Sequence, residues 1–246
     1  MNWRELKNNG QTVLGGAVSG GLDSCTAAHW LSSKGFDVRG YTVDLGQPDE
    51  ESLEPVKRRM VACGATVSEI VDGREALAAV GLQVIQSQAR YEGGYWNTTG
   101  IARPVTVRAI LPRLEDQDIG VFFHGATGRG NDQVRFQLAV NTLAPSLDVY
   151  APWRDPEFVE QFPGRQQMLD YCQANDLPIK PASEARYSTD ASFLGLTHEA
   201  GDLEDVGKSP WFVEPGMGVW PWDSGYCGLS GGRYQLTFDT SAGTGC

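Results

Sequence analysis

The chain has 246 residues, of which 41% are hydrophobic, and its formal net charge is −11 at pH 7. This length allows one large α/β domain, or a domain with an appendage. The acidic excess disfavours binding to a nucleic-acid backbone, because such binding needs clustered Lys and Arg. The sequence has no apolar run long enough to span a membrane and starts without a secretory signal. We therefore expect a cytoplasmic protein that has neither a membrane nor a nucleic acid as partner.

The cysteines favour the same compartment. They are far apart, they form no CxxC motif, and few histidines could join them as metal ligands. We therefore expect reduced thiols and no metal site built by these side chains. The residues concerned are Cys25, Cys63, Cys172, Cys227, Cys246, His29, His124 and His198.

Strands and helices alternate along the first part of the chain. A buried strand at 12–18, a helix at 24–34 and a strand at 38–46 have the length of one βαβ unit. The alternation then continues with a helix at 49–63, a strand at 65–71, helices at 74–90 and 102–116, a strand at 121–125, a helix at 132–142 and a strand at 147–152. This order predicts an α/β fold, a Rossmann-like parallel sheet with helices on both faces.

The composition changes after residue 176. From residue 205 onward the chain contains nine glycines and three of its seven tryptophans, and only 232–240 alternates like a strand. We expect a nucleotide-binding domain at 1–176 and a smaller unit at 177–246, which ends in a short Gly/Trp-rich segment. The tryptophans of that segment predict packing rather than a flexible linker.

One basic cluster stands out in an otherwise acidic chain. Lys57, Arg58 and Arg59 follow each other within the predicted helix at 49–63, among glutamates. Charged residues in such a helix are typical of a solvated face, and we interpret the cluster in this way.

The sequence SGGLDS at 19–24 lies between the first strand and the first helix. Its glycines allow backbone N–H groups to approach an anion, and the helix N-terminus adds free donors and a partial positive charge. Ser19 and Ser24 could donate to phosphate oxygens, and Asp23 could hold a magnesium ion. A glycine turn with a Ser or Asp N-cap is the structural alternative. The full motif resembles the pyrophosphate loop of the ATP pyrophosphatases, which cleave ATP between the α- and β-phosphates.

A second glycine-rich segment, HGATGRGNDQVRF at 124–136, also follows a strand and opens a helix. Asn131 and Arg135 lie four residues apart on one helix face, with Asp132 beside them. Thr127, Asn131 and Asp132 could receive a zwitterion, the first two on its carboxylate and Asp132 on its ammonium. An ordinary capped glycine loop remains the alternative. His124 is typical of a hydrogen-bonded core histidine, although a catalytic base is the other interpretation.

Four segments together resemble one family, argininosuccinate synthase, from about residue 12 to 205. They are the segment at 124–136, YEGGYWNTTGIARP at 91–104, LAPSLDVYAPWRDPEF at 143–158 and HEAGDLED at 198–205. In that family the ureido oxygen of citrulline attacks the α-phosphate of ATP and pyrophosphate leaves. The amine of aspartate then displaces AMP. The resemblance thus implies a ligase that uses ATP and Mg²⁺.

The resemblance also implies a set of site residues. Contacts with ATP are implied for Ala17, Ser19, Gly20, Gly21, Asp23, Ser24, Cys25, Val43, His124, Gly125, Gly128 and Gly130. Aspartate contacts are implied for Thr127, Asn131 and Asp132. Contacts with a citrulline-type substrate are implied for Tyr95, Thr99, Asn131, Arg135, Ser188 and Thr197. Catalytic roles are implied for Asp23, Arg103 and Asp132, with the Arg103 guanidinium near the phosphates. A lone arginine such as Arg103 is otherwise typical of a surface ion pair.

The match breaks mainly where the family selects citrulline. Gly100 stands where the family has a serine, Thr197 replaces another serine, and an SxDEN pattern is reduced at 188–192. The family's chains also continue well beyond the position of Cys246. Because these changes remove hydrogen-bond partners of citrulline, we expect a different carbonyl or ureido substrate, condensed with aspartate.

Three points stay open at this stage. The unit at 177–246 could complete the substrate pocket or form a subunit contact, and we expect a homo-oligomer, either a dimer or a tetramer. Another ATP pyrophosphatase, a sulfur or ammonia transferase, would need a catalytic cysteine or a glutaminase partner. A non-catalytic nucleotide-binding remnant is the third interpretation.

Overall fold

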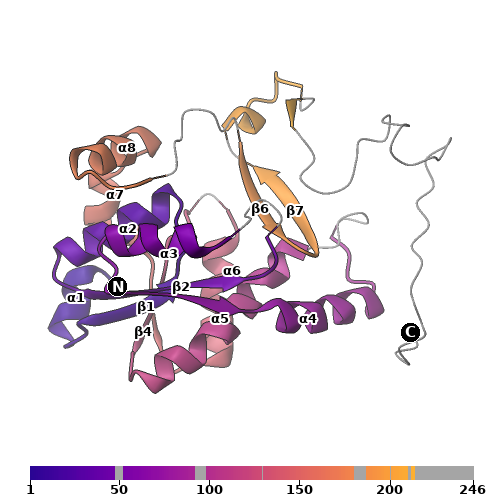
Figure 1. The fold of residues 1–246 in the computed structure, drawn as a ribbon, viewed down its shortest axis with the longest axis horizontal. Helices are drawn as coiled ribbons and strands as arrows, with labels where there is room; N and C mark the ends of the chain where they lie inside the picture. The colour runs from indigo at the N-terminus through magenta and orange to yellow at the C-terminus, as the bar shows by residue number, and fades with distance from the viewer. Residues whose placement is uncertain are drawn as a thin grey trace.

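The computed structural model describes most of the chain, namely residues 1–47, 52–91, 98–128, 130–179, 187–199, 201–209 and 212–213. Its central element is a sheet of parallel strands (Figure 1). In chain order these strands are β1 (Val13–Ala17), β2 (Asp37–Asp44), β3 (Val67–Asp72), β4 (Val121–His124) and β5 (Asp148–Tyr150). The predicted parallel sheet is confirmed.

The strand order, β3-β2-β1-β4-β5, puts β1 in the middle of the sheet. The chain first adds β2 and β3 on one side of β1 and then crosses to add β4 and β5 on the other. The connections that follow β1 and β4 therefore run to opposite sides of the sheet. Such a reversal opens a crevice at the carboxyl ends of the two strands, where α/β proteins bind ligands. The register places Ala17 directly beside His124 at that position.

Eight α-helices and two short 3₁₀ helices surround the sheet in the described residues. They are α1 (Trp3–Asn8), α2 (Leu22–Ser33), α3 (Glu54–Ala62), α4 (Arg74–Gln86), α5 (Thr98–Asp116), α6 (Asp132–Leu143), η1 (Pro152–Arg154), α7 (Pro156–Gln161), α8 (Arg165–Ala174) and η2 (Gly201–Glu204).

Two apolar clusters, one on each face of the sheet, hold the layers together. The first joins α2, α3, α7 and α8 through residues that include Trp30, Met60, Phe158 and Cys172. The second joins α4, α5 and α6 through residues that include Leu77, Ile110 and Phe136. Helices therefore cover both faces, as the alternation predicted.

The close packing of β1 against β4 depends on a glycine. A Cβ at Gly16 would lie 1.9 Å from the carbonyl oxygen of Phe123, well inside any tolerated contact. Only glycine lets the two strands at the switch point approach this closely. The glycine run of the first strand is thus a packing requirement at the centre of the fold.

Several element boundaries differ from the prediction. The helix expected at 49–63 is α3, which starts at Glu54, and part of its expected first turn lies outside the described residues. The helix expected from 102 starts at Thr98, because packing overrides the weak helix propensity of Thr98, Thr99 and Gly100. The short helices α1, α7 and α8 were not predicted, and neither was the hairpin described next.

A two-stranded antiparallel hairpin, β6 (Ser188–Ser192) and β7 (Gly195–Glu199), follows the sheet domain. Its turn packs on the carboxyl end of β2, where the Phe193 backbone N–H donates to the Leu45 carbonyl at 3.0 Å. Figure 1 shows the hairpin projecting from the side of the domain that holds α4, α5 and α6. The predicted strand at 232–240 and most of the Gly/Trp-rich segment lie outside the described residues.

No helix in the described part of the chain is long and apolar enough to cross a membrane.

Candidate functional site

The first glycine loop, residues 18–24, connects β1 to α2 at the switch point. Gly20 has a φ of +66°, a left-handed conformation that glycine adopts without strain. The Ser24 hydroxyl accepts the Ser19 backbone N–H at 3.1 Å and lies 3.2 Å from the Ser19 hydroxyl. These contacts hold both serines of the loop together before any ligand binds.

Helix α2 begins without a side-chain cap. Its N-cap residue is Gly21, and no side chain accepts a hydrogen bond from the first turn. The interpretation of this loop as a glycine turn capped by Ser or Asp is therefore wrong. An uncapped helix N-terminus leaves backbone N–H donors and a partial positive charge for an anion.

Asp23, in the first turn of α2, has a buried carboxylate oxygen, Oδ1, with no hydrogen-bond partner in the described structure. Burial raises the pKa of this carboxyl group, and the Asp23 backbone N–H, the nearby Trp153 indole and the Arg165 charge lower it by less. The buried Trp153 indole N–H, the neighbour that lowers this pKa, forms no hydrogen bond of standard geometry in the described structure. Buried polar atoms are nearly always paired, so an unpaired carboxylate oxygen beside an anion-binding turn fits a missing cation.

The second glycine loop, residues 125–131, connects β4 to α6 and lies against the first. A Cβ at Gly125 would be 3.6 Å from the backbone of Asp23 and Ser24. Gly128 is exposed, and a Cβ at Gly130 would meet no atom within 4 Å. Helix α6 starts with Asn131 as N-cap, again without a side-chain cap bond, close to the predicted start. The two loops therefore present two uncapped helix N-termini at one crevice.

His124, the last residue of β4, lies beneath this crevice and is 2% exposed. Its Nδ1 accepts the Ala126 backbone N–H at 3.3 Å, and its ring stacks on Phe136 with centroids 4.8 Å apart. Burial lowers the pKa of His124 to about 4. The imidazole is therefore neutral at pH 7 and supports the second glycine loop from below.

Arg103 of α5 joins the second glycine loop to the hairpin. Its Nη2 donates to Asp132 Oδ2 at 2.7 Å and to Asp190 Oδ2 at 2.5 Å. Arg135 donates to the other oxygen of Asp132 at 3.0 Å. The Arg103 side chain is only 18% exposed. Arg103 therefore forms an ion pair, but a largely buried one, and the alternative of a surface ion pair is wrong. The described residues offer no partner for its buried Nε.

The pKa values of the two carboxylates of this network shift in opposite directions. Burial raises the pKa of Asp132, but the hydrogen bonds and charges of Arg103 and Arg135 outweigh burial and hold it below its ordinary value. Burial also raises the pKa of Asp190, and there it prevails over the opposing effect of Arg103. Of the two carboxylates, Asp132 is the one whose charged form is favoured by its surroundings.

The hairpin brings two further predicted residues to the same side. Asp190 pairs with Thr197 in the register, and residues opposite each other in an antiparallel pair point to the same face. Ser188, two residues before Asp190, shares that face. Since Asp190 contacts Arg103, the face that carries Ser188 and Thr197 is the one turned toward α5 and the second glycine loop.

The remaining predicted residues fall into three groups. Cys25 and Val43 are buried, so only their backbone atoms could meet a ligand, and Ala17 is the last residue of β1. Thr99 is buried in the first turn of α5, whereas Thr127 is partly exposed in the second glycine loop. Tyr95 lies outside the described residues.

Sequence reasoning missed one residue that contacts the first glycine loop directly. Arg59 of α3, interpreted as part of a solvated helix face, donates from Nη1 to the Gly20 carbonyl at 2.7 Å. For Arg59 that interpretation is wrong, although Arg58 is exposed as expected. Only the position of Arg59 in the last turn of α3, where it can reach back to the sheet, could have indicated this contact.

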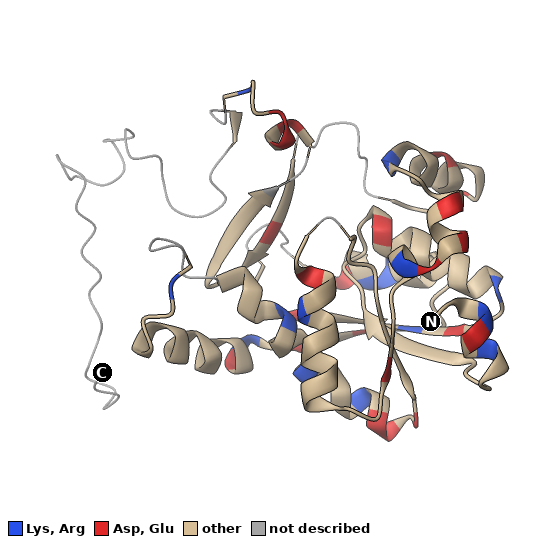
Figure 2. Ribbon diagram, turned by 180° about the vertical axis from the view of Figure 1, so that it is seen from behind, with Lys and Arg blue, Asp and Glu red and all other residues tan. Residues whose placement is uncertain are grey.

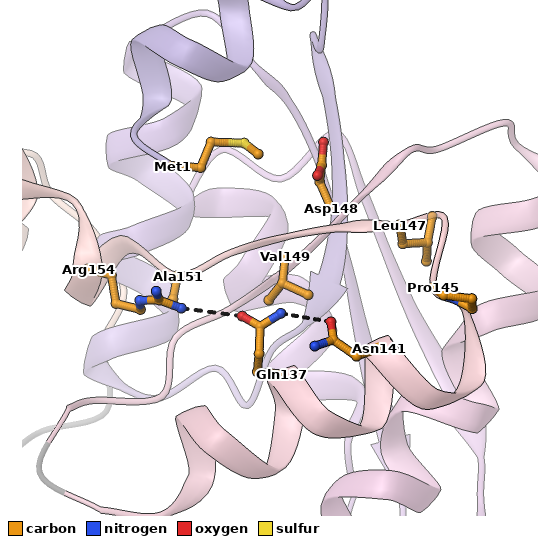
Figure 3. Close-up of a pocket in the computed structure, with 9 residues that line it drawn as sticks. All are labelled: Met1, Gln137, Asn141, Pro145, Leu147, Asp148, Val149, Ala151 and Arg154. Atoms are coloured by element: carbon orange, nitrogen blue, oxygen red, sulfur yellow. Dashed lines mark hydrogen bonds between the residues drawn. The ribbon is translucent and has the colours of Figure 1, made fainter.

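A separate polar cavity of about 380 Å³ lies between β5, the far end of α6 and the N-terminus (Figure 3). Its polar side chains pair with each other, since Arg154 donates to Gln137 at 3.3 Å and Gln137 donates to Asn141 at 3.0 Å. It contains none of the predicted site residues. In the view of Figure 2, basic and acidic residues of the described chain are interspersed, without a single basic face.

Comparison with known proteins assigns a class to this arrangement. The sequence model of the family described as the arginosuccinate synthase N-terminal HUP domain matches residues 12–178. The chain is also similar to two solved structures at low identity. NMN synthetase from Francisella tularensis is 10% identical with a TM-score of 0.44, over 71% of this chain and 66% of that chain. Ammonia-dependent NAD synthetase from Campylobacter jejuni is 12% identical with a TM-score of 0.46, over 71% and 69%.

A curated relative makes the family assignment more specific. Argininosuccinate synthase from Rhodopirellula baltica is 40% identical over 210 residues, which are 85% of this chain and 52% of that protein. The chain therefore spans about half the length of the curated relative that it matches. It belongs to the argininosuccinate synthase family.

Proposed function

We propose that this chain is an argininosuccinate synthase-like ligase, which adenylates a carbonyl or ureido oxygen with ATP and then condenses the product with aspartate. One observation carries the proposal. The two glycine loops meet at the switch point, with Gly125 against the backbone of Asp23 and Ser24, and both following helices begin uncapped. Two adjacent anion-binding turns are suited to the phosphates of a nucleotide.

The residues of the first glycine loop fit ATP and magnesium. Backbone N–H groups at Gly20 and Gly21 and the hydroxyls of Ser19 and Ser24 would hold phosphate oxygens, and the unpaired Asp23 oxygen would hold the cation. When bound, ATP supplies the α-phosphorus for attack, and magnesium neutralises the pyrophosphate that leaves. The protein contributes position and charge stabilisation rather than a strong base.

The second glycine loop fits the aspartate substrate. Thr127 and Asn131 would donate to its carboxylate, and Asp132 would accept its ammonium. Because Arg103 and Arg135 lower the pKa of Asp132, this carboxylate is suited to attract an ammonium and poorly suited to remove its proton. Asp132 would therefore bind and orient the amine, which must lose its proton to another acceptor before it attacks.

The second substrate would lie against Arg135 and the hairpin face that carries Ser188 and Thr197. Tyr95 and Thr99 complete the expected set on the basis of family resemblance. Gly100, buried in α5, offers no hydroxyl where the family has a serine. Because each lost hydrogen bond to a zwitterion weakens binding by about 1–3 kcal/mol, the proposed substrate differs from citrulline.

The cysteines give little support to a sulfur transferase. Cys25, Cys63 and Cys172 are all 0% exposed and belong to one apolar cluster. The sequence suggested isolated cysteines, but the fold gathers these three beneath the first glycine loop. A catalytic thiol must be accessible to its substrate, and among the described residues none is.

The test is the fate of labelled ATP. Protein is incubated with α-³²P-ATP, magnesium, aspartate and one member of a panel of ureido, amide and carboxylate compounds, with citrulline included. The proposal predicts AMP and pyrophosphate for at least one compound, with product formation dependent on aspartate. Formation of ADP alone would contradict it, and tight ATP binding with no turnover on any compound would favour the non-catalytic remnant.

A further inference from the structure

Arg59 reaches from the last turn of α3 into the first glycine loop. Its Nη1 donates to the Gly20 carbonyl at 2.7 Å, across 39 residues of sequence. Gly20 also packs on Val56, since a Cβ at Gly20 would lie 2.8 Å from Val56 Cγ1. Helix α3 therefore supports the left-handed residue of the loop with one apolar and one charged side chain.

The charge of Arg59 has no carboxylate partner in the described structure, unlike that of Arg103 or Arg135, which both contact Asp132. A guanidinium has five N–H donors, and Arg59 uses one of them on Gly20. An arginine that is partly buried and not paired with a carboxylate leaves its positive charge available to an anion.

The loop itself lacks a basic residue. Residues 19–24 contain no Lys or Arg, whereas a Walker loop supplies its own lysine to the phosphates. The Gly20 carbonyl is also a partial negative charge within an anion-binding turn, and its other donor is the neutral Cys25 thiol, whose Sγ lies 3.5 Å from the carbonyl oxygen. Arg59 brings a basic side chain to the loop and a charged donor to this carbonyl from a neighbouring helix.

We propose that Arg59 is a phosphate-binding residue of the first glycine loop, which fixes the Gly20 carbonyl and supplies positive charge to a bound pyrophosphate group. This inference rests on the proposed function. A purely structural role, in which Arg59 only ties α3 to the loop, is the competing explanation. The two differ in whether the charge of residue 59 affects anion binding in a folded protein.

The experiment measures binding of inorganic pyrophosphate with magnesium, and separately of ATP, by isothermal titration calorimetry of the full chain. Four proteins are compared: wild type, Arg59→Gln, Arg59→Lys and Arg58→Gln. Arg58 is the matched control, because it is the preceding residue of the same helix and is exposed. Thermal unfolding of each unliganded protein verifies that it is folded.

We expect Arg59→Gln to weaken pyrophosphate binding by about 10- to 100-fold, as for the loss of a charge-assisted hydrogen bond. Arg59→Lys should recover much of this loss, and Arg58→Gln should bind as wild type. The affinity difference between wild type and Arg59→Gln should shrink as salt is raised, because salt screens charge.

Two results would overturn the inference alone: wild-type affinity in Arg59→Gln, or equal losses in Arg59→Gln and Arg59→Lys, since the latter would mean a tether without a role for charge. Failure of the wild-type protein to bind either pyrophosphate or ATP would overturn both this inference and the proposed function.

Discussion

Two polar regions of this protein satisfy their hydrogen bonds to very different extents. The N-terminal polar cluster, defined as Trp3, Arg4, Lys34, Asp155 and Glu157, is saturated. Asp155 is 1% exposed and accepts from the Trp3 backbone, the Tyr150 hydroxyl and the Glu157 backbone at 2.7, 2.8 and 3.1 Å. Glu157 accepts from the Trp3 indole and from Arg4 at 2.9 and 2.8 Å, and it also pairs with Lys34.

The crevice at the carboxyl ends of β1 and β4 is unsaturated by comparison. Asp23 Oδ1 and Arg103 Nε have no partner in the described structure, and α2 and α6 start without side-chain caps. Leaving a buried polar atom unpaired costs about 1–3 kcal/mol. Such a cost is expected where a ligand completes the pairing, so the contrast separates groups that stabilise the fold from groups held ready for binding.

The largest effect on stability is expected in the N-terminal polar cluster. Asp155→Ala removes the N-cap of α7 and leaves the buried Tyr150 hydroxyl unpaired, so the free energy of unfolding should fall by about 3 kcal/mol. Urea denaturation measures this change. Asp170→Ala, which removes an exposed carboxylate of α8, should change it by less than about 0.5 kcal/mol. If Asp155→Ala instead abolished nucleotide binding in protein that is still folded, the separation of the two regions would break down.

A smaller effect on stability is expected from His124, which lies beneath the crevice. Its Nδ1 can accept the Ala126 backbone N–H only while the imidazole is neutral. Its pKa of about 4 lies below the ordinary 6.5, so the unfolded chain takes up a proton first as pH falls. The stability that His124 contributes is complete above pH 6.5 and is lost as the pH approaches 4. Between about pH 6 and pH 4.5 the loss should be about 2 kcal/mol.

Denaturation of wild type and His124→Gln across this pH range measures the contribution of His124. The variant should lack that part of the pH dependence. Parallel pH profiles for the two proteins would show that the imidazole does not stay neutral in the folded state.

The smallest effect on stability should be of opposite sign. Asp23→Asn keeps the shape of the side chain but removes a charge that burial disfavours, so we expect the unliganded protein to gain about 0.5–1 kcal/mol. The same variant should lose magnesium-dependent ATP binding. Thermal unfolding and calorimetry measure the two properties. A variant that loses stability would mean that Asp23 has a structural role like that of Asp155.

Much of the site could be predicted because its parts are local in sequence. SGGLDS and GATGRGND each contain their own turn residues, and the strand before and the helix after each loop are visible as apolar patterns. Parallel strands have their carboxyl ends at one edge of the sheet, so the sequence predicted both loops at that edge, whereas the strand order of the structure makes them neighbours. The expected positions of β1, β2, β4 and α6 agree with the structure to within a few residues.

The amino-acid sequence by itself thus determined the order of the sheet strands and of the helices α2 to α6, the two glycine loops and the family. Only the tertiary structure decided that Arg59 contacts Gly20, that Arg103 joins Asp132 to Asp190, and that the hairpin packs on β2. These contacts join residues that are between 29 and 148 positions apart in the sequence. Periodicity and turn chemistry act over a few residues, whereas the partner of a long charged side chain depends on how distant elements pack.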